Sequence, residues 1–378
     1  MKEQAAKQTL RDLGERNILE HLIAPRFRYQ ANGIIGLGDD CAVIPAPTAG
    51  QSFVFTTDPC PTPVVCLLEP PDLYHYGWLT MLINVSDLAA MGAQPVGLLV
   101  STVMPESMAT QEYERFLDGL ADASREWGCP VLGGNIKDGP QFTATGSALG
   151  VVESELLMLR TGATPGDRVF VIGDLGFFWS ACLTKLNAET NLSRDHVQEL
   201  NQALYHPQPK IREGIALART RCITSCMDSS DGVIGCLREL AMRNGVNIVV
   251  ESDLLRPHPA VKEVASMAGI DVRKLMLSWG DWQLVCTVRS QAISQIRNLM
   301  QSLGTTCFDI GEVQAGVGTV YLREEDRLEE ITNFANERFS GTSFFTHGLE
   351  AYIDFLRNQP LTIRSPQAGF DDKIGPPI

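Results

Sequence analysis

The sequence lacks the features of a membrane or secreted protein. No apolar run approaches the roughly 18 residues that a membrane-spanning helix needs, and the N-terminal residues MKEQAAKQTLRDLGERN contain no apolar signal core. The ten cysteines include no CxxC pair, which disfavours disulfides and structural zinc and favours buried thiols. We therefore expect a cytoplasmic protein.

The chain also lacks the short motifs of several enzyme classes. There is no GxxxxGK[ST] loop, and no GxGxxG follows a predicted strand. The HRD and DFG motifs of protein kinases and the GxSxG motif of hydrolases are missing as well. Six histidines without an evident Ser/His/Asp order give little support to nucleophilic catalysis. If the chain binds ATP, we expect it to do so through carboxylates and magnesium.

Basic residues are scarce, because 31 Lys and Arg stand against 45 Asp and Glu, for a net charge of −14. This charge repels the phosphates of nucleic acids and anionic lipids, so neither is an expected partner. Small phosphorylated ligands remain compatible with the charge where cations bridge them. With 378 residues, the chain is long enough for two domains that each have a core.

Alternating helix and strand patterns run through both halves and predict an α/β (α+β) fold. The turn-rich stretch at 160–168 is the expected boundary between an N-terminal domain (1–158) and a C-terminal domain (159–330), with a less regular tail at 331–378. We expect strands at 52–57, 96–104, 143–152, 169–172, 246–250 and 284–288, helices at 15–24, 110–127, 211–219 and 293–303, and a glycine-rich turn at 131–139.

The stretch LINVSDLAAMGAQP, residues 82–95, predicts a buried helix, because its positions are apolar nearly all around a helical wheel. Gly92 and Pro95 are expected to end it. Thr80, Asn84 and Asp87 fall on one side at helical spacing. A buried carboxylate needs a partner, so Asp87 should meet a cation, a strong donor or water. An aspartate bonded to nearby backbone is the simpler alternative.

Five acidic sites share a context of Gly, Ser or Thr where a strand ends or a helix begins. Such positions suit phosphates held through Mg²⁺, which prefers hard oxygen ligands and takes one or two carboxylates per ion. Asp231 could instead cap the helix that follows it, and Asp39 could be an ordinary turn residue. The five sites are Asp39/Asp40, Asp58, Asp87, Asp228 and Asp231.

The motifs GLGDDCAVI, TTD, NVSDLAAMGAQP, RTGATPGD and DSSDG occur in this order. In sequence and spacing the chain resembles the thiamine-monophosphate kinase branch of the aminoimidazole-ribonucleotide (AIR) synthetase superfamily over roughly residues 15–325. The resemblance implies a two-domain fold, with an N-terminal α/β domain whose strands build a barrel across a homodimer and a C-terminal α/β domain. It also implies that ATP and several Mg²⁺ ions lie between the domains.

The resemblance assigns roles to individual residues. Those implied as magnesium ligands are Asp40, Thr56, Thr57, Asp58, Asp87 and Asp228. Those implied to meet the nucleotide are Gly134, Asn135, Arg160, Ser230 and Asp231, and Asp87 and Asp231 are the expected catalytic residues. A guanidinium such as that of Arg160 can bind two phosphate oxygens at once.

Several positions depart from the family pattern. The kinases usually have GGDT where this chain has GGNI, so a metal carboxylate becomes Asn135, and Asp138 could compensate. The kinases' histidine after TTD is Val65, and their substrate-touching glutamate is Gly280. Trp279 and Trp282 flank that glycine, Trp279 as a candidate lining of an altered pocket and Trp282 more as a core residue.

These observations predict an ATP- and Mg²⁺-dependent phosphotransferase that acts on a small molecule and forms a homodimer. One alternative is an ATP-dependent synthetase or ligase that activates an amide or carboxylate oxygen. Another is a nucleotide-binding homologue without turnover, for which Asn135 is the main support. The sequence leaves the acceptor unnamed.

Overall fold

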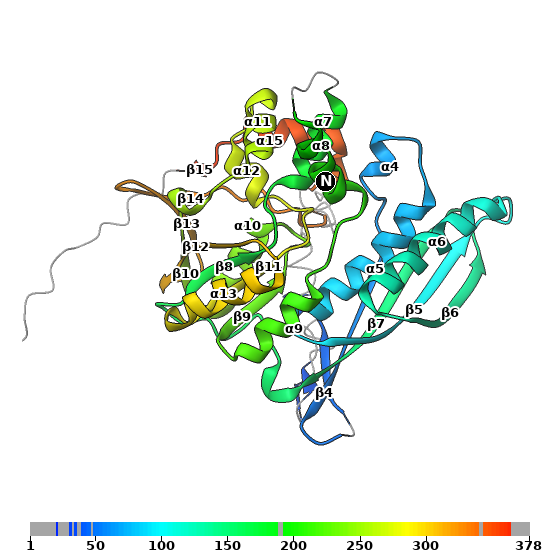
Figure 1. The fold of residues 1–378 in the computed structure, drawn as a ribbon, viewed down its shortest axis with the longest axis horizontal. Helices are drawn as coiled ribbons and strands as arrows, with labels where there is room; N and C mark the ends of the chain where they lie inside the picture. The colour runs from blue at the N-terminus through cyan, green and yellow to red at the C-terminus, as the bar shows by residue number, and fades with distance from the viewer. Residues whose placement is uncertain are drawn as a thin grey trace, which may run out of the picture.

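A computed structural model describes residues 20–21, 30–31, 34–35, 39–46, 48–187, 192–339 and 343–363. The helix predicted at 15–24 lies almost entirely outside these residues. The described strands form two sheets, each with helices packed on it (Figure 1). None of the helices in this part of the chain combines the length and apolar character that a bilayer crossing demands.

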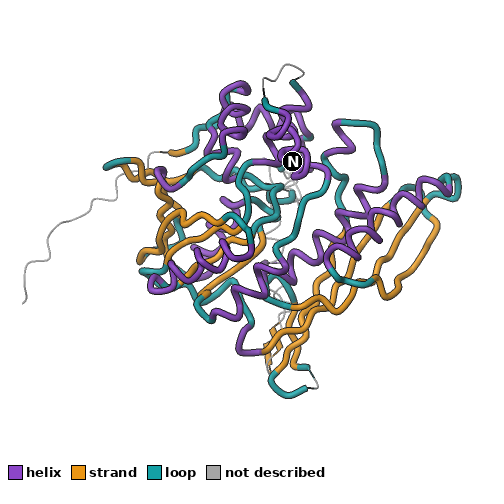
Figure 2. The backbone as a smooth tube through the Cα atoms, viewed as in Figure 1, coloured by secondary structure: helices purple, strands orange, loops and turns teal. Residues whose placement is uncertain are grey.

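The first sheet carries two long helices on one face, α5 (Leu73–Ala90) and α6 (Thr110–Trp127), which Figure 2 shows running along it. A short helix, α4 (Val65–Leu68), precedes them. The predicted strands at 52–57, 96–104 and 143–152 and the helix at 110–127 are all present. The strand order is β1 (Gln30–Ala31), β2 (Ile34–Ile35), β3 (Ala42–Pro45), β4 (Gln51–Pro59), β7 (Thr143–Glu153), β5 (Gln94–Met104) and β6 (Val131–Asp138).

The expected turn at 131–139 is wrong, because these residues form strand β6, which pairs in parallel with β5. Gly134 lies opposite Val100, and a Cβ atom on Gly134 would come within 1.7 Å of the Val100 carbonyl oxygen. The absence of a side chain at Gly134 therefore allows β5 and β6 to approach each other closely. Glycine usually weakens a strand, which is why the sequence favoured a turn here.

Helix α5 is buried as predicted, and it begins earlier, at Leu73, where the Asp72 side chain accepts a hydrogen bond from the Tyr74 amide. Gly92 follows the C-terminal cap with φ of +70°, a conformation that glycine adopts without strain. Leu82, Val85 and other α5 residues have no exposed surface. The helix thus fixes the position of Asp87 from inside the core.

The second sheet has eight strands, and β8 shows how both of its faces are covered. Val169 and Val171 belong to one core cluster, and Phe170 and Ile172 belong to another that also contains residues of α5. The strand order is β15 (Thr362–Ile363), β14 (Arg327–Ile331), β13 (Val320–Glu324), β10 (Val246–Glu251), β12 (Cys307–Ala315), β8 (Arg168–Ile172), β11 (Leu284–Val288) and β9 (Ile223–Asp228).

The C-terminal half contains the two helices predicted at 211–219 and 293–303. Its described α-helices are α7 (Phe177–Leu186), α8 (Arg194–Tyr205), α9 (Ile211–Thr220), α10 (Val233–Asn244), α11 (Pro259–Ala268), α12 (Val272–Leu277), α13 (Ile293–Leu303), α14 (Phe344–His347) and α15 (Leu349–Asn358). The N-cap residue of α10 is Gly232, the residue after Asp231, and the capping role considered for the Asp231 side chain stays a prediction. A φ of +89° at Gly232 turns the chain before the helix can begin.

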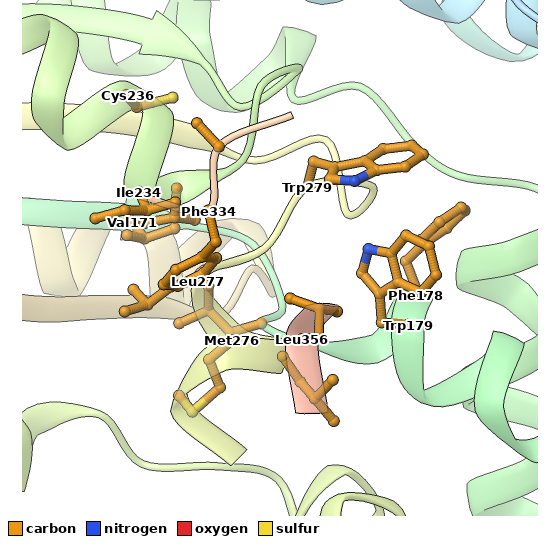
Figure 3. Packing of buried hydrophobic residues seen from close by; sticks show 14 of the residues in the cluster. Val171, Phe178, Trp179, Ile234, Cys236, Met276, Leu277, Trp279, Phe334 and Leu356 are labelled. Carbon is orange, nitrogen blue, oxygen red and sulfur yellow. The ribbon is translucent and has the colours of Figure 1, made fainter. Parts of the chain in front are cut away.

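The tail expected at 331–378 is wrong for its described part, residues 331–339 and 343–363. Phe334, Tyr352 and Leu356 are buried in the same core cluster as Trp179 and Trp279, and Figure 3 shows Phe334 and Leu356 within that packing. Helix α15 supplies two of these residues. The two-domain α/β fold is as predicted. The dimeric barrel stays a prediction, since the strands described here form open sheets.

Helices α5 and α6 touch through their backbones at two glycines. A Cβ atom on Gly77 would lie 2.0 Å from the Phe116 carbonyl oxygen, and one on Gly119 would lie 1.9 Å from the Tyr74 carbonyl oxygen. Neither carbonyl can turn away without breaking its own helix. The helix that carries Asp87 is therefore held in place by a contact that tolerates only glycine.

We predict that Gly119→Ala lowers the free energy of unfolding by about 3 kcal/mol or more, because the methyl group overlaps backbone. Alanine at an open helical position would instead stabilise by about 1 kcal/mol. Denaturant titration followed by circular dichroism measures the difference. The control is Asp118→Ala on the neighbouring, exposed side chain, and an equal effect of both substitutions would contradict the close-contact explanation.

Candidate active site in the cleft between the sheets

A cleft of ≈ 890 Å³ opens between the two halves of the molecule. Strand β4, helix α5 and helix α4 line it from the N-terminal half, and the end of β9, helix α10, two tryptophans before β11 and Glu337, Arg338 and Phe345 line it from the C-terminal half. Twelve of the predicted site residues lie on its walls: Asp40, Thr56, Thr57, Asp58, Val65, Asp87, Arg160, Asp228, Ser230, Asp231, Trp279 and Trp282.

Three carboxylates from distant parts of the sequence meet at the base of the cleft. One oxygen each of Asp40, Asp87 and Asp228 lies within 4.8 Å of the others. Asp228 is 1% exposed at the end of β9, and Asp87 projects from the last turn of α5. Such a cluster of hard oxygen atoms fits a divalent cation such as Mg²⁺.

Hydroxyl groups hold two of these carboxylates in place. The Thr56 hydroxyl donates to Asp87 and lies 3.4 Å from an Asp58 oxygen. The Ser86 hydroxyl donates to Asp228 at 2.8 Å. Asp87 is therefore not bonded to nearby helical backbone, unlike Thr80 and Asn84, whose side chains donate to carbonyl oxygens one turn earlier. Of the three polar residues predicted on this side of the helix, Asp87 is the one that lines the cleft.

Burial and repulsion from neighbouring carboxylates raise the pKa values of Asp87 and Asp228. Burial, followed by the charges of Asp228, Asp58 and Asp40, raises the pKa of Asp87 well above its usual value. Burial and the Asp40 charge raise the pKa of Asp228 to about 7. Adjacent carboxylates that resist ionisation need a cation to become fully charged. The electrostatics therefore agree with the oxygen geometry in favouring a metal.

Arg160 supplies the positive charge closest to Asp40. Its Nε and one terminal nitrogen donate to the two Asp40 oxygens at 3.1 and 2.9 Å, and its backbone N–H donates to both Asp39 oxygens at 3.2 Å. Glu239 of α10 lies 3.9 Å from the guanidinium. A phosphate that reached the carboxylate cluster would meet this guanidinium in a position to make two hydrogen bonds.

The DSSDG motif, residues 228–232, forms a loop that hydrogen bonds to Gln283 and Asn336 hold in place. The Ser230 hydroxyl donates to Asp228 at 3.2 Å, and the Ser229 hydroxyl accepts from the Gln283 amide at 2.8 Å. The Asp231 carbonyl oxygen accepts from the Asn336 amide at 3.1 Å. Ser230 and Asp231 line the cleft beside the carboxylates, where the sequence predicted nucleotide and metal contacts.

Gly134, Asn135 and Gly280 are not among the described residues that line the cleft. Gly134 and Asn135 lie on the edge strand β6, which β7 and β5 separate from β4. At about 4.8 Å per strand, that distance is roughly 14 Å. Thr57 reaches the cleft, although its hydroxyl donates to the Gly146 carbonyl at 2.9 Å.

The opposite end of the cleft has an apolar and aromatic lining. Val65 is 3% exposed at the start of α4. Trp279 is 7% exposed and packs on Trp179 and Phe178 with ring centroids 5.3 and 5.5 Å apart (Figure 3). The half-buried Trp282 has a φ of +54° and turns the chain toward the cleft. Both tryptophans thus border the cleft, and Trp279 is the more deeply packed of the two.

Sequence reasoning missed several residues of the cleft. Glu239 and Arg243 pair across one turn of α10, a spacing that could have been noticed. Phe178 lies in the first turn of α7, and no motif pointed to it. Arg338 and Phe345 come from the segment that was expected to be an irregular tail, so no periodic pattern pointed to them.

A second group of potential metal ligands, His196, Glu199 and His258, lies away from this cleft. The Nδ1 atom of His258 accepts the Ala260 amide at 3.3 Å and caps helix α11. Helix capping accounts for the position of this histidine.

Comparison with known proteins supports the same two-part organisation. Residues 38–152 match the family described as AIR synthase related protein, N-terminal domain, and residues 164–323 match AIR synthase related protein, C-terminal domain. Thiamine-monophosphate kinase of Bacillus subtilis is 30% identical over 324 residues, which cover 83% of this chain and 95% of that protein. The enzyme of the same name from Pyrococcus horikoshii is 29% identical over 315 residues, 82% of this chain and 92% of that protein.

A solved structure described as AaThiL complexed with AMPPCP and TMP has a similar fold. It superposes with a TM-score of 0.71 at 26% identity, covering 86% of this chain and 99% of that chain. The similarity therefore extends across both sheets and the cleft between them.

We predict that Asp87→Asn keeps the fold but weakens MgATP binding by at least about tenfold, because the amide preserves the shape and loses the attraction to the cation. In EDTA the variant should melt at or above the temperature of the wild type, since one repelling charge is gone. Calorimetric titration and thermal melts measure the two effects.

Asp118→Asn is the matched control, because that side chain is 61% exposed on α6. Unchanged MgATP affinity in a folded Asp87→Asn protein would remove Asp87 from the metal site.

Proposed function

Because the chain belongs to the AIR synthase related family, we propose that it is an ATP- and Mg²⁺-dependent phosphotransferase that acts on a small molecule. The observation that carries this proposal is the meeting of the Asp40, Asp87 and Asp228 carboxylates within 4.8 Å of one another. Curated relatives of this chain are named thiamine-monophosphate kinases, and a related structure is described with the ATP analogue AMPPCP.

The residues of the cleft fit the needs of phosphoryl transfer. Asp40, Asp58, Asp87 and Asp228 would hold Mg²⁺, which neutralises phosphate charge when bound. Arg160 would bind phosphate oxygens. Ser230 and Asp231 would orient the nucleotide, because hydrogen bonds to Asp228 and Asn336 hold their loop in place. Phosphoryl transfer needs positioning and charge neutralisation and no covalent intermediate on the protein. This cleft offers no activated nucleophile among its described residues and needs none.

ADP release at saturating MgATP, with and without candidate acceptors, tests the proposal. Acceptor-dependent ADP release with a phosphorylated product supports a phosphotransferase. A product in which the activated oxygen has been displaced supports a synthetase or ligase instead. Tight MgATP binding without ADP release in any mixture supports a nucleotide-binding homologue.

Two positions differ from the family pattern, one on the cleft wall and one directly behind Phe178, which lines the cleft. Val65 stands where the kinases have a histidine, and Gly280 stands where they have a glutamate. The φ of Gly280 is +115°, and a Cβ atom there would lie 2.2 Å from Cδ1 of Phe178. The space that a side chain at 280 would enter is therefore filled by the Phe178 ring, which supports an altered acceptor pocket.

We predict that MgATP binds and that thiamine monophosphate is a poor acceptor. Losing a charged or hydrogen-bonding contact costs about 1.5–3 kcal/mol, so two losses weaken recognition on the order of 10²–10⁴-fold. Formation of ADP and thiamine diphosphate by the purified protein is the assay. Turnover near about one per second at micromolar thiamine monophosphate would show that Val65 and Gly280 have been interpreted wrongly.

A homodimer joined through the first sheet is part of this proposal. Helices α5 and α6 cover one face of that sheet, and the edge strand β6 is exposed along its whole length. Leu132 and Ile136 on β6 are 62% and 68% exposed, and Leu99 on the neighbouring strand β5 is 52% exposed. A long exposed strand with apolar side chains is a site of association between chains.

We predict that light scattering finds about twice the chain mass of 41.4 kDa at micromolar concentration. Ile136→Asp should shift the protein toward the monomer, because a carboxylate cannot be buried unpaired in an interface. The control is Val317→Asp, at a side chain that is 90% exposed in the other half of the molecule. A wild-type mass of one chain would contradict the dimer.

A further inference from the structure

Residues 332–339 and 343–345, here called the C-terminal loop, follow the part of the chain that matches the family, which ends at residue 323. Its residues Arg338 and Phe345 line the same cleft as the carboxylates and the two tryptophans.

Buried bonds fix the C-terminal loop to the DSSDG motif. Asn336 is 1% exposed, its backbone N–H donates to the Asp231 carbonyl at 3.1 Å, and its side-chain oxygen accepts the Phe344 amide at 3.0 Å. Phe334 and Phe344 are buried in the core on either side. The loop is therefore part of the cleft wall, and a hydrogen bond joins it to Asp231 beside the carboxylate cluster.

Arg338 lies between the carboxylates and the aromatic end of the cleft. Its guanidinium carbon is 4.1 Å from the centroid of the Phe345 ring. Burial raises the pKa of Asp58, and hydrogen bonds from Asp87 and Thr56 and then the charge of Arg338 counter that rise. The guanidinium is thus close enough to act on a carboxylate of the metal cluster while its flat side rests on an aromatic ring.

Three rings continue from that point as an aromatic wall, defined as Phe345, Trp279 and Phe178. The centroids of Phe345 and Trp279 are 5.9 Å apart, and those of Trp279 and Phe178 are 5.5 Å apart. Phe178 occupies the space beside Gly280. A flat apolar group can lie along this wall and gain from burial and ring contact.

We propose that Arg338 positions the acceptor by binding its anionic group, a phosphate or a carboxylate, while the acceptor's flat apolar body lies on the aromatic wall. This proposal rests on the proposed phosphotransferase function. An arginine fork suits both anions, and the absence of a carboxylate side chain at position 280 removes a counter-charge that a cationic body would need.

The position of Arg338 places the bound anion next to the carboxylate cluster. An oxygen of the acceptor anion would form a bond to the γ-phosphorus of ATP as the bond from that phosphorus to the β–γ bridging oxygen breaks and ADP leaves. No proton has to be removed from such an oxygen, so the transfer needs no general base.

Phenyl phosphate, benzyl alcohol and inorganic phosphate are the probes, titrated calorimetrically into the full chain with saturating Mg²⁺ and ADP. Arg338→Gln should bind phenyl phosphate about 10- to 100-fold more weakly than the wild type, with little change for benzyl alcohol. Arg338→Lys should recover part of the loss, because it keeps the charge without the fork. Inorganic phosphate should bind more weakly than phenyl phosphate, since it cannot use the wall.

Two controls separate charge from structure. Arg219→Gln, at an exposed position of α9, should leave every affinity unchanged. Glu337→Gln, beside Arg338 on the cleft, should not weaken phenyl phosphate binding. Thermal melts check that each variant is folded.

Equal phenyl phosphate affinities in the wild type and Arg338→Gln, or no binding to the wild type at about 10 mM, would overturn the proposal for Arg338. The proposed function fails separately, by absence of MgATP binding to the wild type. If the protein binds MgATP, but Arg338→Gln and the control Arg219→Gln bind phenyl phosphate with equal affinity, the proposed function stands and this acceptor assignment fails.

Discussion

The repulsion among buried carboxylates is the constraint on which this structure depends. Asp40, Asp87 and Asp228 meet within 4.8 Å, where burial and neighbouring carboxylate charges raise the pKa values of Asp87 and Asp228. A fold that spreads them apart would relieve this repulsion, so rigid elements have to hold them together. Thr56, Ser86 and Arg160 offset part of the cost through hydrogen bonds and charge. A cluster of carboxylates that repel one another favours the binding of a ligand that brings several positive charges.

Helix α5 provides most of the required rigidity. Its backbone meets that of α6 at Gly77 and Gly119, and a Cβ atom on Gly214 of α9 would lie 2.1 Å from its Ala89 carbonyl oxygen. The helix is therefore held on two sides by glycine contacts that leave no room for sliding. It also belongs to the core cluster that includes Phe170 and Ile172 of the second sheet. Asp87 and Asp228 consequently keep their spacing through one continuous core.

Sequence reasoning predicted the elements whose patterns are local and periodic. The buried helix around Asp87, the helix at 110–127 and most strands follow from apolar spacing, and the clustering of the acids follows from the motifs around them. It failed where a tertiary contact overrides local preference. Gly133 and Gly134 predicted a turn, but the close approach to Val100 makes them part of a strand. The N-cap position fell on Gly232, one residue after the aspartate that the sequence offered for it. The contacts of the C-terminal loop involve residues more than 100 positions apart, such as Asn336 and Asp231, and no periodicity encodes them.

The two ends of the cleft are built from different kinds of structure, and this separates nucleotide chemistry from acceptor choice. Asp58, Asp87 and Asp228 stand on β4, α5 and β9, which belong to the two sheets and their core, so the fold fixes the spacing of these carboxylates. The acceptor end is made from the short helix α4, the first turn of α7 and a loop that follows residue 323. Such segments can change their side chains without altering the spacing of the carboxylates. A cleft of this construction can keep one way of holding a phosphate donor while its acceptor wall, here Phe178, Trp279 and Phe345, is rebuilt for another small molecule.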